Sequence, residues 1–433
     1  MAISMPFRDA VTTARYEAAL TVTQPLRVVQ RGRHSRRALA RQAGRRGDGR
    51  RLPTLDGLRG VAALVVLVHH AFLSQPALAA PYLDPRTADD GGVVWWLTWT
   101  PLHLVWAGTE AVFVFFVLSG LVLTLPAMTG RLRLRAYYAA RLLRLYPPVW
   151  AAVALAVGVA LLVPRVWPEG ASWWMVAMNQ PVTPRGVAAD LTLLVAPGAV
   201  NHVLWSLQWE MVFSLLLPVF VVVAVSRRVA WSHKIAAALA AVGAAAVFDS
   251  VAVSALAMFL LGSLLASGRA HVDYAAAVIE GQRRPTLCWA LVGLLAAVLL
   301  SAYWLVNAPG WDLPADHPLV ALTRALQALG ACLVVAIAWY CPGARRVLSS
   351  RVAQWLGARS FSLYLVHLPL VSATVLLLGG TPPLWAVLLI SVPAALLATA
   401  LFHRVIEQPS HRLARRAAAR LAAGPVRAGS ITR

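Results

Sequence analysis

The sequence predicts an all-α protein, a polytopic membrane bundle of about ten transmembrane helices with both termini in the cytosol. Three observations predict this fold class. Of the 433 residues, 59% are hydrophobic and 13% are charged, and the mean hydropathy is +0.68, which is too apolar for a soluble domain. Apolar runs that could cross a bilayer recur along the chain. Most arginines lie in the short loops between these runs.

The apolar runs begin at residue 58 and continue to residue 402. A helix needs about 20 residues to cross the hydrocarbon core squarely, so the fifth and sixth runs, which share the turn at Asp249 and Ser250, are short for a span. Gly and Pro inside a run are compatible with membrane helices. The runs are Leu58–Leu73, Ala107–Pro126, Pro148–Val163, Val203–Val225, Ile235–Phe248, Val251–Ala266, Thr286–Val306, Leu319–Tyr340, Phe361–Leu378 and Pro383–Phe402.

The loop charges predict the orientation. Cytosolic loops of membrane proteins carry an excess of Lys and Arg. Alternate loops here are rich in arginine, whereas the other set holds only Arg86, Arg165 and Arg185 together with several acids. Both termini are therefore predicted to be cytosolic, in a multi-pass protein of the cell membrane. The longest outer segments follow the first and third runs, where they could cover a site from outside.

The net charge of +22 comes almost entirely from arginine, since Lys234 is the only lysine. The positive-inside rule explains this charge without a nucleic-acid partner, so the expected surroundings are a lipid bilayer and no nucleic acid. The three cysteines, Cys288, Cys332 and Cys341, lie in or beside apolar runs without metal-ligand spacing. Neither a metal site nor a disulfide framework is expected.

Three regions follow from composition. Residues 1–52 are polar, rich in arginine and poor in acids, and are predicted to form a disordered cytosolic tail. They contain no apolar core of the kind that a signal peptide needs. Residues 53–412 hold all the apolar runs and form the membrane domain. Residues 413–433 are a basic cytosolic tail.

The first run carries ionisable residues at both ends. Arg59 and His70 are eleven residues apart, so on a helix they share a face at a separation of about 16 Å. His69 is rotated away by about 100°. His70 can act as a general base at neutral pH, or it can be a histidine of the outer interface that bonds to water or backbone. His69 has the same two interpretations, of which the structural one is favoured.

Other polar residues stand inside or beside apolar runs. Glu210 lies inside the fourth run, where a carboxylate needs an arginine partner or a wet cavity. Glu110 lies near the start of the second run, where it could simply be a polar residue at the outer end of the helix. Arg324 lies inside the eighth run, from which it can snorkel outwards or point into a cavity. Ser119 precedes Gly120 in mid-helix, where a small residue indicates close helix packing rather than a nucleophile.

A pair of arginines opens the third run. Arg141 and Arg144 are three residues apart and share one face of a helix. Guanidinium forks suit phosphate groups, so the pair could hold an anionic ligand at the cytosolic surface. The alternatives are topogenic charge and contact with lipid head groups.

Six phrases of the sequence together resemble the acyltransferase-3 family of integral-membrane acyltransferases, of the O-acetyltransferase type. They occur in the family's order and cover most of residues 55–412. The phrases are Leu55–His70, Ala111–Gly120, Arg141–Pro147, Trp205–Pro218, Ser360–Pro369 and Ile406–Pro409.

The resemblance implies transfer of an acyl group, often acetyl, from cytosolic acyl-CoA to a hydroxyl of a carbohydrate, glycolipid, polysaccharide or glycosylated metabolite. Acyl-CoA is then a co-substrate, and no cofactor is permanently bound. The family's histidine follows its arginine by eleven residues, which selects His70 over His69 as the base. Arg141 and Arg144 match the pair that engages the donor, Arg59 is a donor-side or structural partner, and Glu210 matches the glutamate of the fourth span.

The same resemblance names supporting residues and two departures. The family often has an acid two positions before its Phe-Phe pair; Phe113 stands there in this chain, and Glu110, one turn earlier, is a candidate substitute. The family's usual Phe-Tyr pair after the glutamate of the fourth span is Phe213-Ser214 in this chain. Candidates for acceptor binding or support are His69, Glu110, Ser119, Tyr364 and His367.

The competing interpretation is a membrane transporter. His70, Glu210 and Arg324 inside apolar runs would also suit a path for protons or substrate. Against it, no pair of broken helices recurs in two halves of the chain.

In the acyltransferase interpretation, Glu210 would orient the histidine or bind the acceptor.

Overall fold

The computed structural model of the chain describes residues 52–84, 87, 91–130, 133–308, 313 and 317–423. Within these ranges the chain is helical and contains no β-strand, which confirms the all-α prediction. The N-terminal tail lies outside the described residues except for Leu52, and so does the tail after Ala423. The described part of the C-terminal tail is helical and belongs to α19 (Gln408–Ala423).

Seven of the described helices are long and apolar enough to cross a membrane, or eight if the bent pair α11–α12 is one span. Each predicted run lies within one helix, to within a residue at its ends, except Thr286–Val306, which is divided at Ser301 into α13 and α14. The helices α10 and α13 are shorter than a full span. The prediction of a multi-pass membrane bundle is thus confirmed in kind, whereas the count of ten and the orientation remain predictions. The principal helices are α2 (Pro53–Phe72), α5 (Gly108–Ala127), α6 (Leu134–Leu162), α9 (Leu204–Val225), α10 (Trp231–Val247), α11 (Val251–Ser267), α12 (Arg269–Glu280), α13 (Pro285–Leu300), α15 (Pro318–Tyr340), α17 (Arg351–Leu377) and α18 (Leu384–Phe402).

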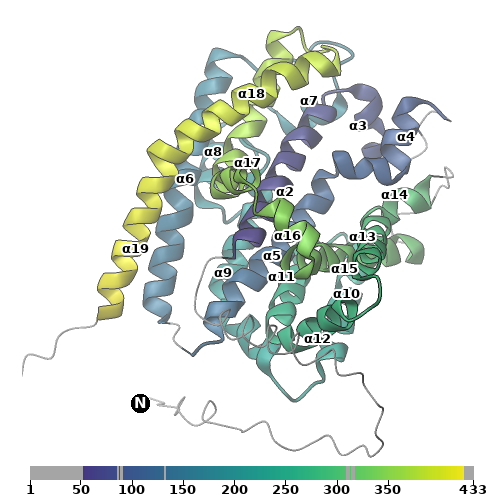
Figure 1. Cartoon of the computed structure of the whole chain (residues 1–433). Coiled ribbons are helices and arrows are strands. Elements are labelled where there is room, and N and C mark those ends of the chain that lie inside the picture. The colour runs from purple at the N-terminus through teal and green to yellow at the C-terminus, as the bar shows by residue number, and fades with distance from the viewer. Residues whose placement is uncertain are drawn as a thin grey trace, which may run out of the picture.

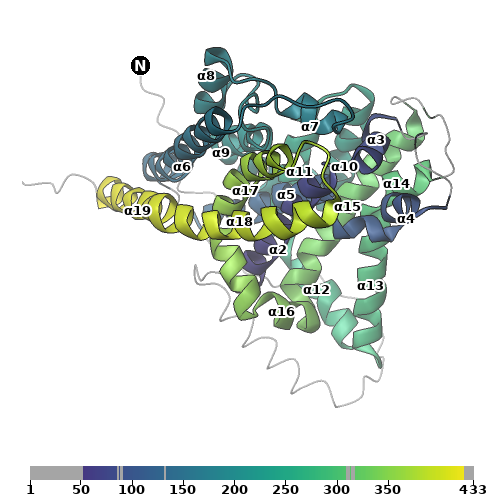
Figure 2. The ribbon, with the colours of Figure 1, turned by 90° about the horizontal axis from the view of Figure 1, so that it is seen from above.

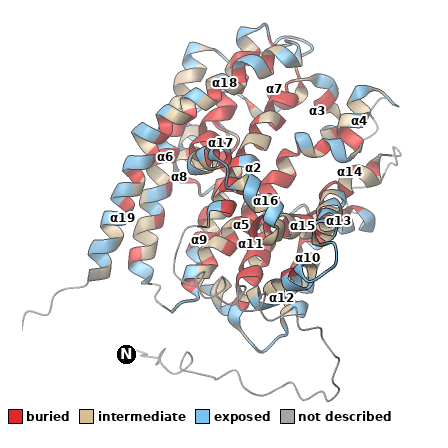
Figure 3. Cartoon of the chain, in the orientation of Figure 1, coloured by how far each residue is buried: buried red, intermediate tan, exposed pale blue. Residues whose placement is uncertain are grey.

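The helices α2, α5 and α17 form the interior of the bundle (Figures 1 and 3). In their apolar stretches 67, 67 and 72% of the residues are buried, against 28% in α9 and 22% in the stretch that begins with α18. Polar residues of α2 and α17 therefore lie inside the protein rather than against lipid.

Glycines allow the interior helices to touch. A Cβ at Gly60 of α2 would lie 2.4 Å from the backbone nitrogen of Gly357 in α17, and one at Gly120 of α5 would lie 2.1 Å from the carbonyl oxygen of Phe259 in α11. Such close backbone approach is the usual packing of small residues between membrane helices. It agrees with the close packing predicted around Ser119 and Gly120.

Short helices cover the ends of the bundle. The segment after α2 and the one after α6 meet beside the C-terminal end of α2, where Ser172 Oγ donates to the Leu73 carbonyl at 2.6 Å. Both outer segments therefore cover this end of α2, as expected from their length. The short helices are α3 (Pro76–Leu83), α4 (Val93–Trp99), η2 (Pro101–Val105), α7 (Trp173–Met178), α8 (Pro184–Thr192), α14 (Ala302–Asn307) and α16 (Pro342–Leu348).

The helix α18 continues through one π-helical turn, η3 (His403–Glu407), into α19. Figures 1 and 2 show α19 lying beside α6 and running out from the bundle. π-Helical turns are uncommon and often occur at functional sites.

Candidate active site

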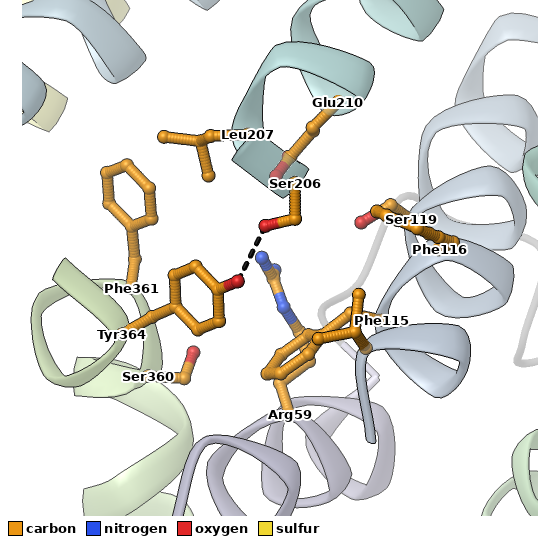
Figure 4. A pocket seen from close by; sticks show the side chains of 11 residues that line it. Arg59, Phe115, Phe116, Ser119, Ser206, Leu207, Glu210, Ser360, Phe361 and Tyr364 are labelled. Atoms are coloured by element: carbon orange, nitrogen blue, oxygen red, sulfur yellow. Dashed lines mark hydrogen bonds between the residues drawn. The ribbon is translucent and has the colours of Figure 1, made fainter. Parts of the chain in front are cut away.

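A pocket of about 440 Å³, counting its open mouth, lies between α2, α5, α9 and α17 (Figure 4). It brings together four of the residues selected from the sequence, which are Arg59, Ser119, Glu210 and Tyr364. Two further hydroxyl groups and several apolar side chains complete it. The lining residues are Arg59, Val112, Phe115, Phe116, Ser119, Ser206, Leu207, Glu210, Ser360, Phe361 and Tyr364.

Arg59 is the pocket's free cation. Its side chain rises from α2 into the pocket towards Ser206 and Tyr364 (Figure 4). Its Nε is buried and makes no hydrogen bond to any described residue. A buried N–H donor without a partner costs free energy, and an anionic or polar ligand that accepts from it would remove that cost.

Glu210 is paired with Arg141. The Arg141 Nη2 donates to Glu210 Oε1 at 2.7 Å, and the Arg141 Nε donates to Ser214 Oγ at 3.0 Å. Ser214, which departs from the family's usual residue, therefore helps to hold the arginine. Glu210 makes no hydrogen bond to His70, so its geometry matches the interpretation as an arginine partner better than that of a residue orienting the base.

Positive charge exceeds negative charge around Glu210. Besides Arg141, the charges of Arg59 and Arg144 act on its carboxylate. The Arg144 side chain is exposed, and it has no hydrogen bond or ion pair with any side chain in the described ranges. This excess makes the mouth of the pocket suitable for an anion.

His70 does not line the pocket but forms a buried pair with His367 of α17. The His70 Nδ1 lies 2.8 Å from the His367 Nε2, and the His367 Nδ1 lies 2.9 Å from the Leu363 carbonyl oxygen. A carbonyl oxygen only accepts, so the proton of His367 is on Nδ1 and its Nε2 accepts from the Nδ1–H of His70. The Nε2 of His70 is then the unprotonated nitrogen, and it makes no hydrogen bond within the described ranges.

Tyr364 lies between the pocket and the histidine pair. Its ring lines the pocket, and the ring centroids of Tyr364 and His367 are 5.9 Å apart. The hydroxyl groups of Tyr364 and Ser206 are hydrogen-bonded at 2.6 Å (Figure 4). This bond joins α9 to α17 and closes the inner end of the pocket on the side of His70.

The neighbouring His69 has a different set of contacts. Its Nδ1 donates to the Trp106 carbonyl oxygen at 2.8 Å, and its ring stacks on the indole of Trp106. Gly108 packs so closely that a Cβ there would lie 2.3 Å from the His69 ring. The structure thus places His69 in packing, as the favoured interpretation of the sequence has it.

On its other face, His70 packs on the indole of Trp174 from α7, with ring centroids 5.0 Å apart. Trp174 is not among the site residues predicted from the sequence. Ser206 and Ser360 were also missed, although both lie inside phrases that resemble the family.

Glu110 lies in a separate buried cluster and does not line the pocket. Its Oε1 accepts from Trp304 Nε1 at 3.0 Å and from Gln327 Nε2 at 2.8 Å. The His103 Nε2 lies 3.9 Å from Glu110 Oε2, and burial lowers the pKa of His103 well below its usual value, so this ring is neutral. The candidate substitution of Glu110 for an acid at position 113 places its carboxylate away from Arg59 and Tyr364.

Arg324 belongs to the same cluster as Glu110. Its guanidinium group lies 4.0 Å from the centre of the Tyr303 ring and donates to Gln327 Oε1 at 3.0 Å. Within the described ranges, no three His, Cys, Asp or Glu side chains are grouped so that they could hold a metal ion.

Comparison with known proteins gives two matches. The family model described as "Acyltransferase domain", of the acyltransferase-3 type, matches residues 52–404. The protein named acyltransferase MdmB from Streptomyces mycarofaciens is 28% identical over 392 residues, which cover 84% of this chain and 92% of that protein. No solved structure matches the chain significantly.

Proposed function

This chain belongs to the acyltransferase-3 family, and from that premise we propose that it is an acyl-CoA-dependent O-acyltransferase in which His70 is the general base. The acyl group is acetyl, and the acceptor is a hydroxyl of a sugar, glycolipid, polysaccharide or glycosylated metabolite. The membership itself makes the protein a membrane acyltransferase, which decides against the transporter interpretation.

The observation that carries the proposal is the hydrogen-bonded chain from Leu363 through His367 to His70. The His367 Nδ1 donates to the Leu363 carbonyl oxygen and the His70 Nδ1 donates to the His367 Nε2, which leaves a lone pair on the Nε2 of His70. A neutral imidazole with a fixed tautomer is what a general base needs, since no proton has to be lost before it acts.

In the proposed reaction, His70 Nε2 takes the proton of the acceptor hydroxyl. The resulting alkoxide oxygen attacks the thioester carbonyl carbon, and the carbon–sulfur bond then breaks. The leaving thiolate takes the proton from the Nε2 of His70, so that the base is restored and CoA leaves as a thiol. General-base help is worth about 10²–10⁴-fold in rate.

The donor would enter at the arginines. Arg59, with its unused Nε, and the neighbouring Arg144 offer charge-assisted hydrogen bonds to the phosphate groups of CoA. Along α2 the rise from Arg59 to His70 is about 16 Å, a distance that the extended pantetheine arm of CoA can bridge. The pocket would hold the inner part of this arm, beside Ser119 and Tyr364.

The thioester must pass Tyr364 to reach His70. In the proposed cycle, the bond between Tyr364 and Ser206 therefore opens when the donor is bound. With the predicted orientation, the donor enters from the cytosol and the acceptor comes from the outer side, where α7 covers His70.

The proposal is tested by release of CoA from acetyl-CoA by the full chain purified in detergent, with a panel of sugar and glycoside acceptors. We expect release that depends on one class of acceptor and falls by at least 10²-fold in His70→Ala. His69→Asn is the matched control, because it changes the adjacent histidine, keeps a donor for the Trp106 carbonyl oxygen and leaves the pair of His70 and His367 in place. Near-normal turnover of His70→Ala would rule out the assigned base.

A further inference from the structure

The helix α19 places basic side chains at the donor's entrance. Its docking on α6 is fixed by Ser410, whose Oγ donates to the Leu143 carbonyl at 2.5 Å. Leu143 precedes Arg144, one of the two arginines assigned to the donor. Figures 1 and 2 show the two helices side by side along the length of α19.

Residues at a spacing of four share one face of a helix, so Glu407, His411 and Arg415 form one row. The next row consists of Arg412, Arg416 and Arg420. The His411 Nε2 lies 3.6 Å from Glu407 Oε1, and the charges of both Arg144 and Arg415 act on the His411 ring. The row of Glu407, His411 and Arg415 therefore faces Arg144. The row of Arg412, Arg416 and Arg420 lies on a different face of α19.

The charge of Glu407 offsets part of this positive charge, but one oxygen of its carboxylate is already engaged in two hydrogen bonds. Its Oε2 accepts from Ser362 Oγ at 2.5 Å and from His403 Nδ1 at 2.8 Å. Arg144 is exposed and has no ion pair within the described ranges, and Arg415 is exposed as well. The two guanidinium groups outnumber the one carboxylate of Glu407, so positive charge remains in excess and favours a further anion between the docked helices.

We propose that Arg144, His411 and Arg415 form an outer subsite for a phosphate group of the donor. The inference rests on the proposed function, since it assumes that the donor is a CoA thioester. Along α19, Arg415 is one turn farther from the bundle than His411, and Arg59 lies deepest, inside the pocket. In CoA, the 3′-phosphate is the phosphate group farthest from the thioester. It is therefore assigned to Arg415, the residue farthest from the pocket.

A lipid head group carries the same phosphate chemistry, but the second row is better placed for it. Arg412, Arg416 and Arg420 are exposed and lie away from Glu407. Basic residues beside a bilayer attract anionic lipids without a built site. The two rows therefore provide a test residue and a matched control of equal charge on one helix.

The experiment measures equilibrium binding of CoA and of 3′-dephospho-CoA to the full chain in uncharged detergent. The variants are Arg415→Gln, its control Arg416→Gln, and Arg415→Lys, which keeps the charge. We expect Arg415→Gln to weaken CoA binding by about tenfold, as loss of one charge-assisted hydrogen bond would. Binding of 3′-dephospho-CoA should change by less than twofold, and Arg415→Lys should retain part of the CoA affinity.

Three outcomes would overturn the subsite. If Arg415→Gln and Arg416→Gln bind CoA equally well, the subsite is wrong although the proposed function stands. If adding phosphatidylglycerol to the micelles reveals a difference between these variants while CoA affinity is unchanged, the ligand is a lipid. If the unmodified chain binds neither CoA nor 3′-dephospho-CoA, the proposed donor fails together with the subsite.

Discussion

The Nδ1 of His70 lies 2.8 Å from the Nε2 of His367, and this contact joins two helices across 297 residues of sequence. Both rings are buried, at 7% and 0% exposure. The contact fixes the tautomer and the orientation of the proposed base, much as a carboxylate or carbonyl fixes a histidine in hydrolases and metal sites. His367 is thus a positioning residue, since it acts on substrate only through His70.

The positioning role of His367 can be tested by comparing a substitution that keeps a hydrogen-bond acceptor for His70 with one that removes it. A Gln at 367 can put its Oε1 near the place of the Nε2, whereas a Leu cannot accept a hydrogen bond. We expect His367→Leu to lower kcat by about 10²-fold and His367→Gln to retain a larger part of it. Steady-state rates in acetyl-CoA check this, with the KM for acetyl-CoA nearly unchanged in both variants. Equal losses in the two variants would assign His367 to packing alone.

Tyr364 should control the length of acyl chain that the enzyme accepts, because it closes the inner end of the pocket beside the histidine pair. Replacement by Ala removes the ring and the bond to Ser206. We expect the ratio of kcat/KM for hexanoyl-CoA to that for acetyl-CoA to rise by at least tenfold in Tyr364→Ala, since one methylene group in a pocket is worth about 10–200-fold.

The control for Tyr364 is Phe361, which lines the same pocket one turn earlier in α17. Phe361→Ala enlarges the pocket without opening the side towards His367, so the preference for acetyl-CoA should remain. A similar gain of hexanoyl transfer in both variants would mean that pocket volume, and not the closure by Tyr364, sets the chain length.

The sequence predicted the helical bundle because membrane spans leave a strong signal in hydropathy. It selected four of the residues that line the pocket, Arg59, Ser119, Glu210 and Tyr364, because they belong to family phrases. It did not predict which polar residues meet. His70 and His367 are brought together by the crossing of α2 and α17, and that crossing depends on Gly60 and Gly357. Glu110 was grouped with the site because it is one turn from Phe113, yet its helix face turns towards Gln327. The periodicity of a sequence predicts which residues share a helix face, but the packing of the helices decides which residues that face contacts.

The docking of α19 on α6 was not predicted, for a related reason. Composition alone marked residues 413–433 as a basic tail, and nothing in the local pattern showed that Ser410 would dock this helix against α6. The signal that was available is the four-residue spacing of Glu407, His411 and Arg415, which marks one face of a helix.

Glu210 should support stability more than chemistry, because its carboxylate is paired with Arg141 at 2.7 Å. Glu210→Gln keeps the shape and an acceptor oxygen for Arg141 but removes the negative charge, which leaves the guanidinium group of Arg141 without its counter-charge. We expect a lower melting temperature in detergent together with CoA binding that is unchanged or tighter, since the pocket loses its negative charge. Weaker CoA binding with an unchanged melting temperature would instead place Glu210 among the donor ligands.

The crossing of α5 and α11 should be intolerant of a single methyl group at Gly120. A Cβ there would lie 2.1 Å from the carbonyl oxygen of Phe259, and both backbones are held by further contacts at Gly262. Overpacking of a close contact costs about 1–3 kcal/mol, so Gly120→Ala should melt at a lower temperature than the unmodified chain. Gly158 in α6 is the control, since a Cβ there meets no atom within 4 Å and Ala is the better helix former by about 1 kcal/mol. Gly158→Ala should therefore melt no lower than the unmodified chain, and equal melting temperatures for the two variants would show that α5 and α11 can separate without cost.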